Sequence, residues 1–306
     1  MKYALITGAN GFIGRRLCQS LLMTGVKIKK HVRLEDPLDK CEQYECDLEV
    51  NEFSKNALNG IDVVYHLAGL AHDVKSTSLN LNQYQTVNVH ATIRIATIAA
   101  EQKIKHFIFI SSVKAGGASI PGECKSEGNQ SEPQGIYAQT KRDAEIKLLE
   151  IGRLTGMKVT IIRPALVYGP NVKGNLELML LGIRKGWFLP ISDAGNIRSM
   201  IHVDDLVRAL IFVTNNINVD KDIYIATDGC PHSTRELYEA MCFSLGRRVP
   251  SWSIPSSYLN ILSLCSRGMK NKVNKLLGDD CYSSGRLQAL GFKPDRTLNE
   301  INETNF

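Results

Sequence analysis

A tyrosine and a lysine four residues apart, Tyr137 and Lys141, are the residues of this sequence best suited to proton transfer. On a helix this spacing places both side chains on the same face. A phenol normally keeps its proton until about pH 10, and a neighbouring ammonium group lowers that pKa by stabilising the phenolate. The pair therefore predicts a general acid–base site, although the same spacing also occurs on helix faces that only meet solvent.

Two hydroxyl groups that could complete such a site follow an apolar segment. Residues 105–110 have the pattern of a buried strand, and the next two residues are Ser111 and Ser112. Side chains at the carboxyl end of a parallel strand face the ligand crevice of an open α/β sheet. We therefore expect both hydroxyl groups to point into a ligand crevice. The simpler alternative is that the two serines only end the strand.

The amino-terminal segment predicts a dinucleotide site. Residues 2–7 form an apolar strand pattern, three glycines follow at Gly8, Gly11 and Gly14, and an amphipathic helix pattern comes next. We expect Gly8 to make a tight turn, Gly11 to let the backbone approach a pyrophosphate, and Gly14 to let the helix pack on the strand. A glycine turn in this strand–helix context is a strong signal.

The end of the second expected strand, residues 26–32, favours NADP. Arg33 stands near the place where an acid would bind the adenosine 2′-hydroxyl of NAD, and an arginine there would pair with a 2′-phosphate. An exposed arginine without a ligand is the alternative, so NAD stays open. Asp47, after a short third strand, is expected either to bond the adenine amino group or to cap the next helix.

Further segments predict the fold class. Strand patterns at 62–66, 105–110 and 158–162 alternate with helix patterns at 83–103 and 137–155. This order predicts an α/β fold with a Rossmann-type, doubly wound parallel sheet. The alternation loosens after residue 170. We therefore expect a dinucleotide-binding domain over 1–170 and a smaller substrate-binding lobe over 171–306, some of whose strands and helices return to the first domain.

Composition excludes several classes of protein. The chain has 306 residues, of which 43% are hydrophobic and 22% charged, as in ordinary globular proteins. The net charge of +6 comes from no basic run, so we expect no nucleic-acid partner. The eight cysteines lack metal-ligand spacing, and we expect no metal and small buried thiols in a reducing compartment.

Two features bear on location. The chain begins with a strand pattern, and it contains no apolar run long enough to span a membrane, so we expect a cytoplasmic protein. Basic residues around 267–275 stand beside four leucines. We expect a solvated helix face there rather than peripheral contact with a membrane. The leucines are Leu262, Leu264, Leu276 and Leu277.

Several motifs carry a resemblance to a known family. Residues 7–14 (TGANGFIG) resemble T-G-x-x-G-x-x-G, and residues 66–69 (HLAG) are similar to H-L-A-A. Residues 163–170 (RPALVYGP) resemble R-P-x-x-V-Y-G-P, and residues 198–205 (RSMIHVDD) resemble R-x-x-I-H-V-D-D. With Ser112 at the usual distance before Tyr137, the chain resembles the extended short-chain dehydrogenase/reductase superfamily of nucleotide-sugar epimerases, dehydratases and reductases.

The resemblance implies roles for individual residues. The catalytic set is Ser112, Tyr137 and Lys141. Substrate binding falls to Ser111, Lys114, Asn175 and Arg198, with Arg198 meeting the nucleotide phosphates. Residues 279–282 offer no counterpart to a second phosphate-binding arginine. Besides Tyr137 and Lys141, the implied cofactor-binding residues are Gly8, Asn10, Gly11, Phe12, Ile13, Gly14, Arg33, Asp47, Leu48, Leu67, Ala68, Gly69, Pro164 and Val167.

The resemblance also implies a reaction. Residues 111–114 and 172–175 look most like a bacterial surface-polysaccharide branch. With Arg33, this favours an NADP-dependent enzyme that reduces the C4 ketone of a UDP-4-keto-6-deoxy-N-acetylhexosamine. The alternative is a 4-epimerase for UDP-glucose or UDP-N-acetylglucosamine with bound NAD. A regulator that binds a dinucleotide without catalysis is disfavoured, because the whole catalytic set is present. A homodimer through 83–103 and 137–155 is implied by the resemblance alone.

Overall fold

Seven parallel strands organise the chain, in the order β3-β2-β1-β4-β5-β6-β9. The computed structural model describes residues 1–50, 52–71, 78–219, 222–263 and 266–298. The order reverses between β1 and β4, which is where a doubly wound sheet opens its ligand crevice. The predicted fold class is confirmed. The strands are β1 (Tyr3–Thr7), β2 (Lys27–Val32), β3 (Glu42–Glu45), β4 (Val63–His66), β5 (His106–Ile110), β6 (Lys158–Pro164) and β9 (Ile223–Ala226).

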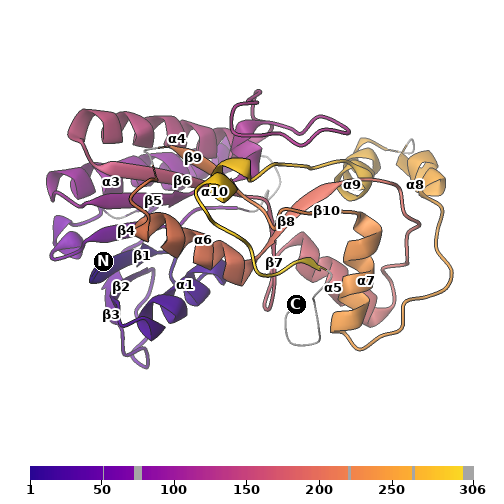
Figure 1. Cartoon of the computed structure of the whole chain (residues 1–306), viewed down its shortest axis with the longest axis horizontal. Helices are drawn as coiled ribbons and strands as arrows, with labels where there is room; N and C mark the ends of the chain where they lie inside the picture. The colour runs from indigo at the N-terminus through magenta and orange to yellow at the C-terminus, as the bar shows by residue number, and fades with distance from the viewer. Residues whose placement is uncertain (51, 72–77, 220–221, 264–265, 299–306) are drawn as a thin grey trace.

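Helices cover both faces of this sheet (Figure 1). On one face, Ile6 and Ile108 pack with Leu17 of α1 (Phe12–Met23) and with α6 (Val203–Asn215). On the other, Leu5 and Phe107 pack with α3 (Ala91–Glu101) and α4 (Ile136–Thr155). Neighbouring residues of a strand point to opposite faces, so burial on both sides requires continuous apolar strands. Each fully buried side chain of this kind contributes about 1.5–3 kcal/mol.

The helical segment before β5 differs from the prediction. Residues 83–103 were expected to form one helix, but α2 (Ser78–Tyr84) is followed by a π-helical turn, η2 (Gln85–His90), and only then by α3. Asn88 lies in this turn and is fully buried. In its side chain, Oδ1 accepts a hydrogen bond from Leu70 N at 2.8 Å and Nδ2 donates one to Leu70 O at 3.1 Å. The wider turn presents Asn88 to the segment after β4, and π-turns of this kind are frequent at functional sites.

The second half of the chain adds a small sheet, in the order β10-β8-β7, and most of the remaining helices. α6, β9 and α10 lie with the large sheet, whereas α5, α7, α8 and α9 lie to one side of it (Figure 1). Ser233 caps α7, because Ser233 and Glu236 form a reciprocal capping box. None of the described helices is long and apolar enough to cross a membrane. The elements not yet given bounds are η1 (Lys55–Leu58), η3 (Val113–Gly116), β7 (Leu166–Tyr168), α5 (Asn175–Lys185), β8 (Arg198–His202), β10 (Pro231–His232), α7 (Thr234–Ser244), α8 (Ser256–Ser263), α9 (Arg267–Leu277) and α10 (Gly285–Ala289).

A disulfide joins Cys124 to Cys281, 157 residues later. The expectation of free thiols is therefore wrong for these two residues. The spacing of the cysteines gave no warning, because the fold alone brings the two segments together. Lys125 N donates to Cys281 O at 3.0 Å, and Ser283 N donates to Lys125 O at 2.8 Å. Cys265 lies outside the described residues, and the free cysteines are Cys18, Cys41, Cys46, Cys230 and Cys242.

Candidate active site

The turn between β1 and α1 is built so closely that it requires glycine. Gly8 has a φ of +67°, and a Cβ there would lie 2.8 Å from Ala68 N. A Cβ on Gly14 would lie 2.1 Å from Gly8 O. Gly11 N donates to Gly8 O at 2.9 Å, and Gly11 caps α1, whose first turn carries no acid. The positive end of the α1 dipole therefore faces a backbone cradle suited to a pyrophosphate.

A small pocket of about 70 Å³ opens beside this turn. Besides Asn10, Gly11 and Phe12 it is lined by three cations, Arg15, Arg16 and Lys173. A larger cavity of about 510 Å³ lies at the opposite end of the strands, beside the residues where they begin. The small pocket is the better candidate for the cofactor, because it combines positive charge with a helix amino terminus.

The segment after β4 lies against the same turn. Thr7 Oγ1 accepts hydrogen bonds from the amides of Leu67 and Ala68, both at 3.1 Å. Gly69 follows, and a Cβ there would lie 3.2 Å from Lys141 Nζ and 3.0 Å from Asn88 Oδ1. The predicted cofactor residues Leu67, Ala68 and Gly69 are thus placed between the glycine turn and Lys141.

The ends of β2 and β3 carry the residues expected near the adenosine. Arg33 follows β2 directly and is exposed, and Leu48 is buried. The Asp47 carboxylate accepts a hydrogen bond from Glu49 N at 3.0 Å and so closes a turn. It does not cap the next helix, because Ser54 caps η1 by accepting from Asn56 N. The helix-cap alternative for Asp47 is wrong, and its adenine contact stays a prediction.

Ser112 and Tyr137 are brought together. The Ser112 hydroxyl accepts a hydrogen bond from Lys114 N at 3.2 Å, and Ser112 lies close enough to the Tyr137 phenol to act on its pKa. Burial raises the pKa of Tyr137 to about 12, and Ser112 opposes this rise. The expectation that an ammonium group lowers this pKa is wrong in this structure, because desolvation is the largest influence on the phenol. Tyr137 therefore keeps its proton at neutral pH.

Lys141 is buried one helical turn after Tyr137 and is only 4% exposed. Its Nζ donates to Ile110 O at 2.9 Å and lies 4.5 Å from the centre of the Phe109 ring. Burial lowers the pKa of Lys141 to about 8, and the negative charge of Glu145 opposes the shift. The ammonium form thus depends on the groups around it, because its solvation by water is largely removed.

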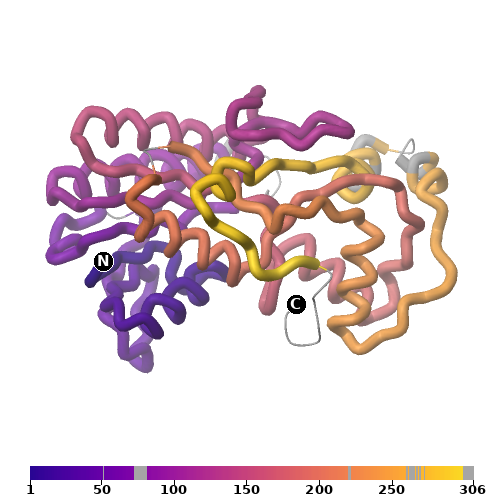
Figure 2. Tube along the Cα trace, viewed as in Figure 1, coloured from indigo at the N-terminus to yellow at the C-terminus, as the bar shows by residue number. Residues whose placement is uncertain are grey.

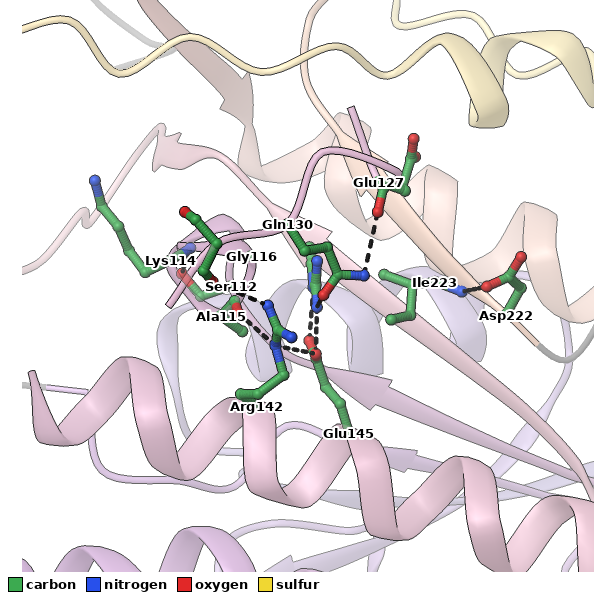
Figure 3. Close-up of polar contacts among 12 residues, drawn as sticks. Ser112, Lys114, Ala115, Gly116, Glu127, Gln130, Arg142, Glu145, Asp222 and Ile223 are labelled. Atoms are coloured by element: carbon green, nitrogen blue, oxygen red, sulfur yellow. Dashed lines mark hydrogen bonds and ion pairs between the residues drawn. The ribbon is translucent and has the colours of Figure 1, made fainter. Parts of the chain in front are cut away.

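A buried ion pair joins Glu145 of α4, one turn after Lys141, to Arg163 of β6. Arg163 Nε donates to Glu145 Oε1 at 2.8 Å, and a terminal nitrogen of Arg163 lies 2.5 Å from Oε2. Both side chains are 1% exposed. Figure 3 shows Arg142 and Glu145 on one face of α4, turned toward the loop that carries Ala115 and Gln130. Arg142 Nε donates to Ala115 O at 2.7 Å, so the network ties α4 to β6 and to the loop after Ser112.

The predicted substrate residues have different surroundings. Ser111 is 2% exposed, and its hydroxyl has no hydrogen-bond partner among the described residues. Lys114 Nζ lies 2.7 Å from both oxygens of Asp280. Arg198 donates to the carbonyls of Lys275 and Gly278, at the end of α9, and burial lowers its pKa. Asn175 opens α5 and is exposed.

The remaining predicted cofactor residues lie close to these segments. Pro164 ends β6 and is buried, and Val167 lies in β7 and is half-buried. Ile13 lies in the first turn of α1 and is half-buried. Nothing in the structure separates their contribution to cofactor binding from their packing, so their roles stay predictions.

Sequence reasoning missed the buried residues that hold α4, β6 and the loop after Ser112 together. The Glu145–Arg163 pair and the buried Lys125 carried no local signal. Lys125 Nζ donates to Ala118 O and Ser131 Oγ, both at 2.8 Å, and so holds the loop after Ser112. Asn88 did give a signal, because it is a poor helix former in a helical pattern. In the structure the Asn88 side chain forms specific hydrogen bonds with Leu70 and Thr140.

Comparison with known proteins defines the class of this chain. Residues 4–226 match the NAD dependent epimerase/dehydratase family, and the chain belongs to this family. It is 31% identical to a UDP-glucose 4-epimerase of Vibrio cholerae over 98% of this chain and 93% of the relative. It is 28% identical to the N-acetyl-alpha-D-glucosaminyl-diphospho-ditrans,octacis-undecaprenol 4-epimerase of Escherichia coli O157:H7, over 82% of this chain and 75% of that one.

Solved structures show the same fold. A UDP-glucose 4-epimerase of Thermotoga maritima, determined with UDP-glucose, has a TM-score of 0.78 at 21% identity and covers 99% of this chain and 96% of its own. A UDP-glucose 4-epimerase of Thermus thermophilus, determined with NAD, has a TM-score of 0.78 at 23% identity, with 99% and 97% covered. The family match and the similarity to named enzymes identify the chain as an enzyme of the NAD dependent epimerase/dehydratase family.

Proposed function

We propose that this enzyme catalyses oxidation and reduction at C4 of a UDP-linked hexose, with Ser112, Tyr137 and Lys141 as its catalytic residues. The observation that carries the proposal is the buried ammonium group of Lys141. It lies one helical turn after Tyr137 and donates to the last residue of β5, which Ser112 follows at the same end of the strands as the glycine turn. Three groups able to move or hold a proton thus lie beside a cradle suited to a dinucleotide.

Each of these residues has a distinct role in the proposal. Tyr137 has a pKa of about 12 and acts as the proton donor when a C4 ketone is reduced. Ser112 hydrogen-bonds the same oxygen and fixes its approach. Lys141 supplies positive charge beside Gly69 and Asn88, where the nicotinamide ribose would lie. The nicotinamide group, when bound, supplies or accepts the hydride.

We favour 4-epimerisation as the overall reaction. The two relatives reported above are both 4-epimerases by name, and they differ in what carries the sugar, UDP in one and undecaprenyl diphosphate in the other. An epimerase oxidises C4, lets the keto sugar turn over, and returns hydride to the other face with the same catalytic groups. UDP-glucose and UDP-N-acetylglucosamine are the substrates that we propose first.

A second candidate is the NADP-dependent reduction of a UDP-4-keto-6-deoxy-N-acetylhexosamine. The observation that favours it is Arg33, which is exposed directly after β2, where a 2′-phosphate would lie. A reductase must release its oxidised cofactor and bind a reduced one, and NADPH is the usual biosynthetic donor. An epimerase instead recycles one bound NAD.

One experiment separates the two reactions. The purified protein is given UDP-glucose or UDP-N-acetylglucosamine without added cofactor, and the sugars are followed by NMR. In parallel it is given the 4-keto sugar with NADPH or NADH, and loss of the reduced cofactor is followed by absorbance. Equilibration of the UDP-hexoses supports the epimerase, and oxidation of NADPH by the keto sugar supports the reductase. Inactivity in both arms would overturn the proposed substrate class.

A further inference from the structure

Both tryptophans of the chain lie exposed in the second half. Trp187 is 57% exposed and Trp252 is 55% exposed, and the sequence contains no other tryptophan. Tryptophan side chains are highly buried on average, so two exposed ones call for an explanation. Three further large side chains, Leu189, Tyr258 and Ile261, are 43%, 57% and 63% exposed.

These side chains come from segments that lie side by side. Ile191 and Ile254 form a parallel bridge, and Ile254 N donates to Pro190 O at 2.9 Å. Leu189 and Trp252 each stand two residues before that bridge, so the parallel register brings them together. Ser256 N donates to Ser192 Oγ at 3.0 Å, which anchors the start of α8 to the same place. We define Trp187, Leu189, Trp252, Tyr258 and Ile261 as the distal patch.

Positively charged residues are frequent in the segments that carry the distal patch, and Glu239, paired with Arg235 beside Ile191, is an acid close to it. Residues 240–278 contain six arginines and lysines and no acid. Among them Arg248, Lys270 and Lys275 are exposed. α5 ends in two further exposed cations, separated from Trp187 by one glycine. The exposed acid Asp193 marks the edge of this region. The cations whose exposure the structure describes are Arg184, Lys185, Arg247, Arg248, Lys270 and Lys275.

This combination fits the interface of an anionic bilayer. Tryptophan and tyrosine rings sit at the level of the lipid headgroups, and lysine and arginine are drawn to acidic headgroups. A second copy of the chain fits poorly, because a two-fold contact through this surface would bring the same cations face to face. The dimer expected through α3 and α4 would use other elements and leave the patch exposed.

We propose that the distal patch docks the enzyme peripherally on an anionic lipid bilayer, with its aromatic rings among the headgroups and its cations over acidic lipids. α8 and α9 lie at the end of the molecule opposite β2 and β3 (Figure 2), so docking leaves the large sheet away from the bilayer. The inference does not rest on the proposed reaction.

The inference replaces the expectation of a merely solvated basic helix. That expectation considered residues 262–277 alone. Leu276 and Leu277 are half-buried, and Leu264 lies outside the described residues. The exposed apolar side chains instead come from the segments at 187–189 and 252–261, which the fold places together.

Tryptophan emission tests the proposal directly, because both tryptophans belong to the patch. The whole protein is mixed with vesicles of phosphatidylglycerol and phosphatidylcholine in equal parts, or of phosphatidylcholine alone. We expect a blue shift and co-sedimentation with the anionic vesicles only, with both lost at 1 M salt, where charges are screened beyond about 3 Å. No shift with anionic vesicles, or equal binding to both kinds, would overturn the proposal.

Variants assign the binding to the patch. Replacing two cations, Arg248→Ala with Lys270→Ala, should weaken binding about 30-fold. Trp252→Ser should weaken it as well, with Trp187 left as the reporter. Ile217→Ser is the matched control, because Ile217 is 93% exposed outside the patch. Unchanged binding in the patch variants would contradict the proposal. A blue shift and a doubled mass on raising the protein concentration without vesicles would assign the patch to a second copy of the chain.

Discussion

At Tyr137, burial and the neighbouring Ser112 act on the pKa of the phenol in opposite directions. Desolvation dominates and raises the pKa to about 12, while Ser112 lowers it. Lys141 behaves in the complementary way, because burial lowers its pKa to about 8. At neutral pH Tyr137 is therefore a neutral phenol and Lys141 is mainly an ammonium group. These states suit proton donation from the phenol with a fixed positive charge beside it.

The Tyr137→Phe variant tests the donor role. It removes the proton and keeps the ring, so we expect kcat to fall by roughly 10²- to 10⁴-fold. Cofactor affinity, measured by calorimetry, and the melting temperature should stay close to those of the parent. Full activity in this variant would refute the assignment of Tyr137.

The Arg33→Asp variant tests cofactor selection. Charge-assisted hydrogen bonds contribute about 1.5–3 kcal/mol, so NADP affinity should fall by roughly 10- to 100-fold while NAD affinity is kept or improved. Lys27→Asp is the matched control, because Lys27 is exposed at the other end of the same strand. Equal NADP binding by the Arg33 variant and the parent would remove the argument for NADP.

At the scale of elements, the sequence predicts what local patterns determine. Apolar runs located the strands, and the spacing of Gly8, Gly11 and Gly14 located the turn. The π-turn at Asn88 was not predicted, because it depends on Leu70, a residue brought near by the fold. The Glu145–Arg163 pair was missed for the same reason, since it joins α4 to β6.

The Glu145→Gln variant tests the effect of that pair on Lys141. The Glu145 anion raises the pKa of Lys141, so its loss should lower that pKa further below about 8. The alkaline limb of kcat/KM should then move to lower pH, because the ammonium form is lost earlier. An alkaline limb at the parental pH would show that Glu145 does not act on Lys141.

Controls for this variant follow from the burial of the pair. Glu150→Gln should leave the pH profile unchanged, because Glu150 lies on the same helix with its side chain 46% exposed. Breaking one partner of a buried ion pair costs about 3–5 kcal/mol, so urea unfolding is measured in parallel. Should Glu145→Gln fail to fold, Glu145→Met with Arg163→Met removes both charges, and its pH profile is read in the same way.

At the scale of the whole molecule, the disulfide connects the loop after the catalytic serine to a segment near the carboxyl terminus. Cys124 belongs to the loop after Ser112, and Cys281 follows Asp280, which holds Lys114. The backbone of Arg198 also forms an isolated β-bridge with that of Asp280. The short segment at residues 280–281 therefore links the small sheet to the loop beside the catalytic serine. The geometry of the predicted substrate residues therefore depends on a contact between distant parts of the chain.

The Cys124→Ser variant tests the contribution of this link to stability. In the chain-entropy account, a crosslink that closes a loop of this length stabilises the fold by about 5 kcal/mol at most. We expect a lower urea midpoint for the variant, and for the parent in reductant. Cys230→Ser, at an exposed free cysteine, serves as the control. Identical midpoints with and without reductant would show that the link adds nothing to stability.

The disulfide closes one part of the polypeptide into a covalent ring and leaves a tail on each side of it. Residues 124–281 form this ring, which contains Tyr137, Lys141 and Arg198. The glycine turn and Ser112 lie on the amino-terminal tail outside it. A protease that cuts within the exposed residues 193–195 would open the ring without releasing a fragment. The nicked enzyme would remain one particle, and two bands would separate on a gel only after reduction.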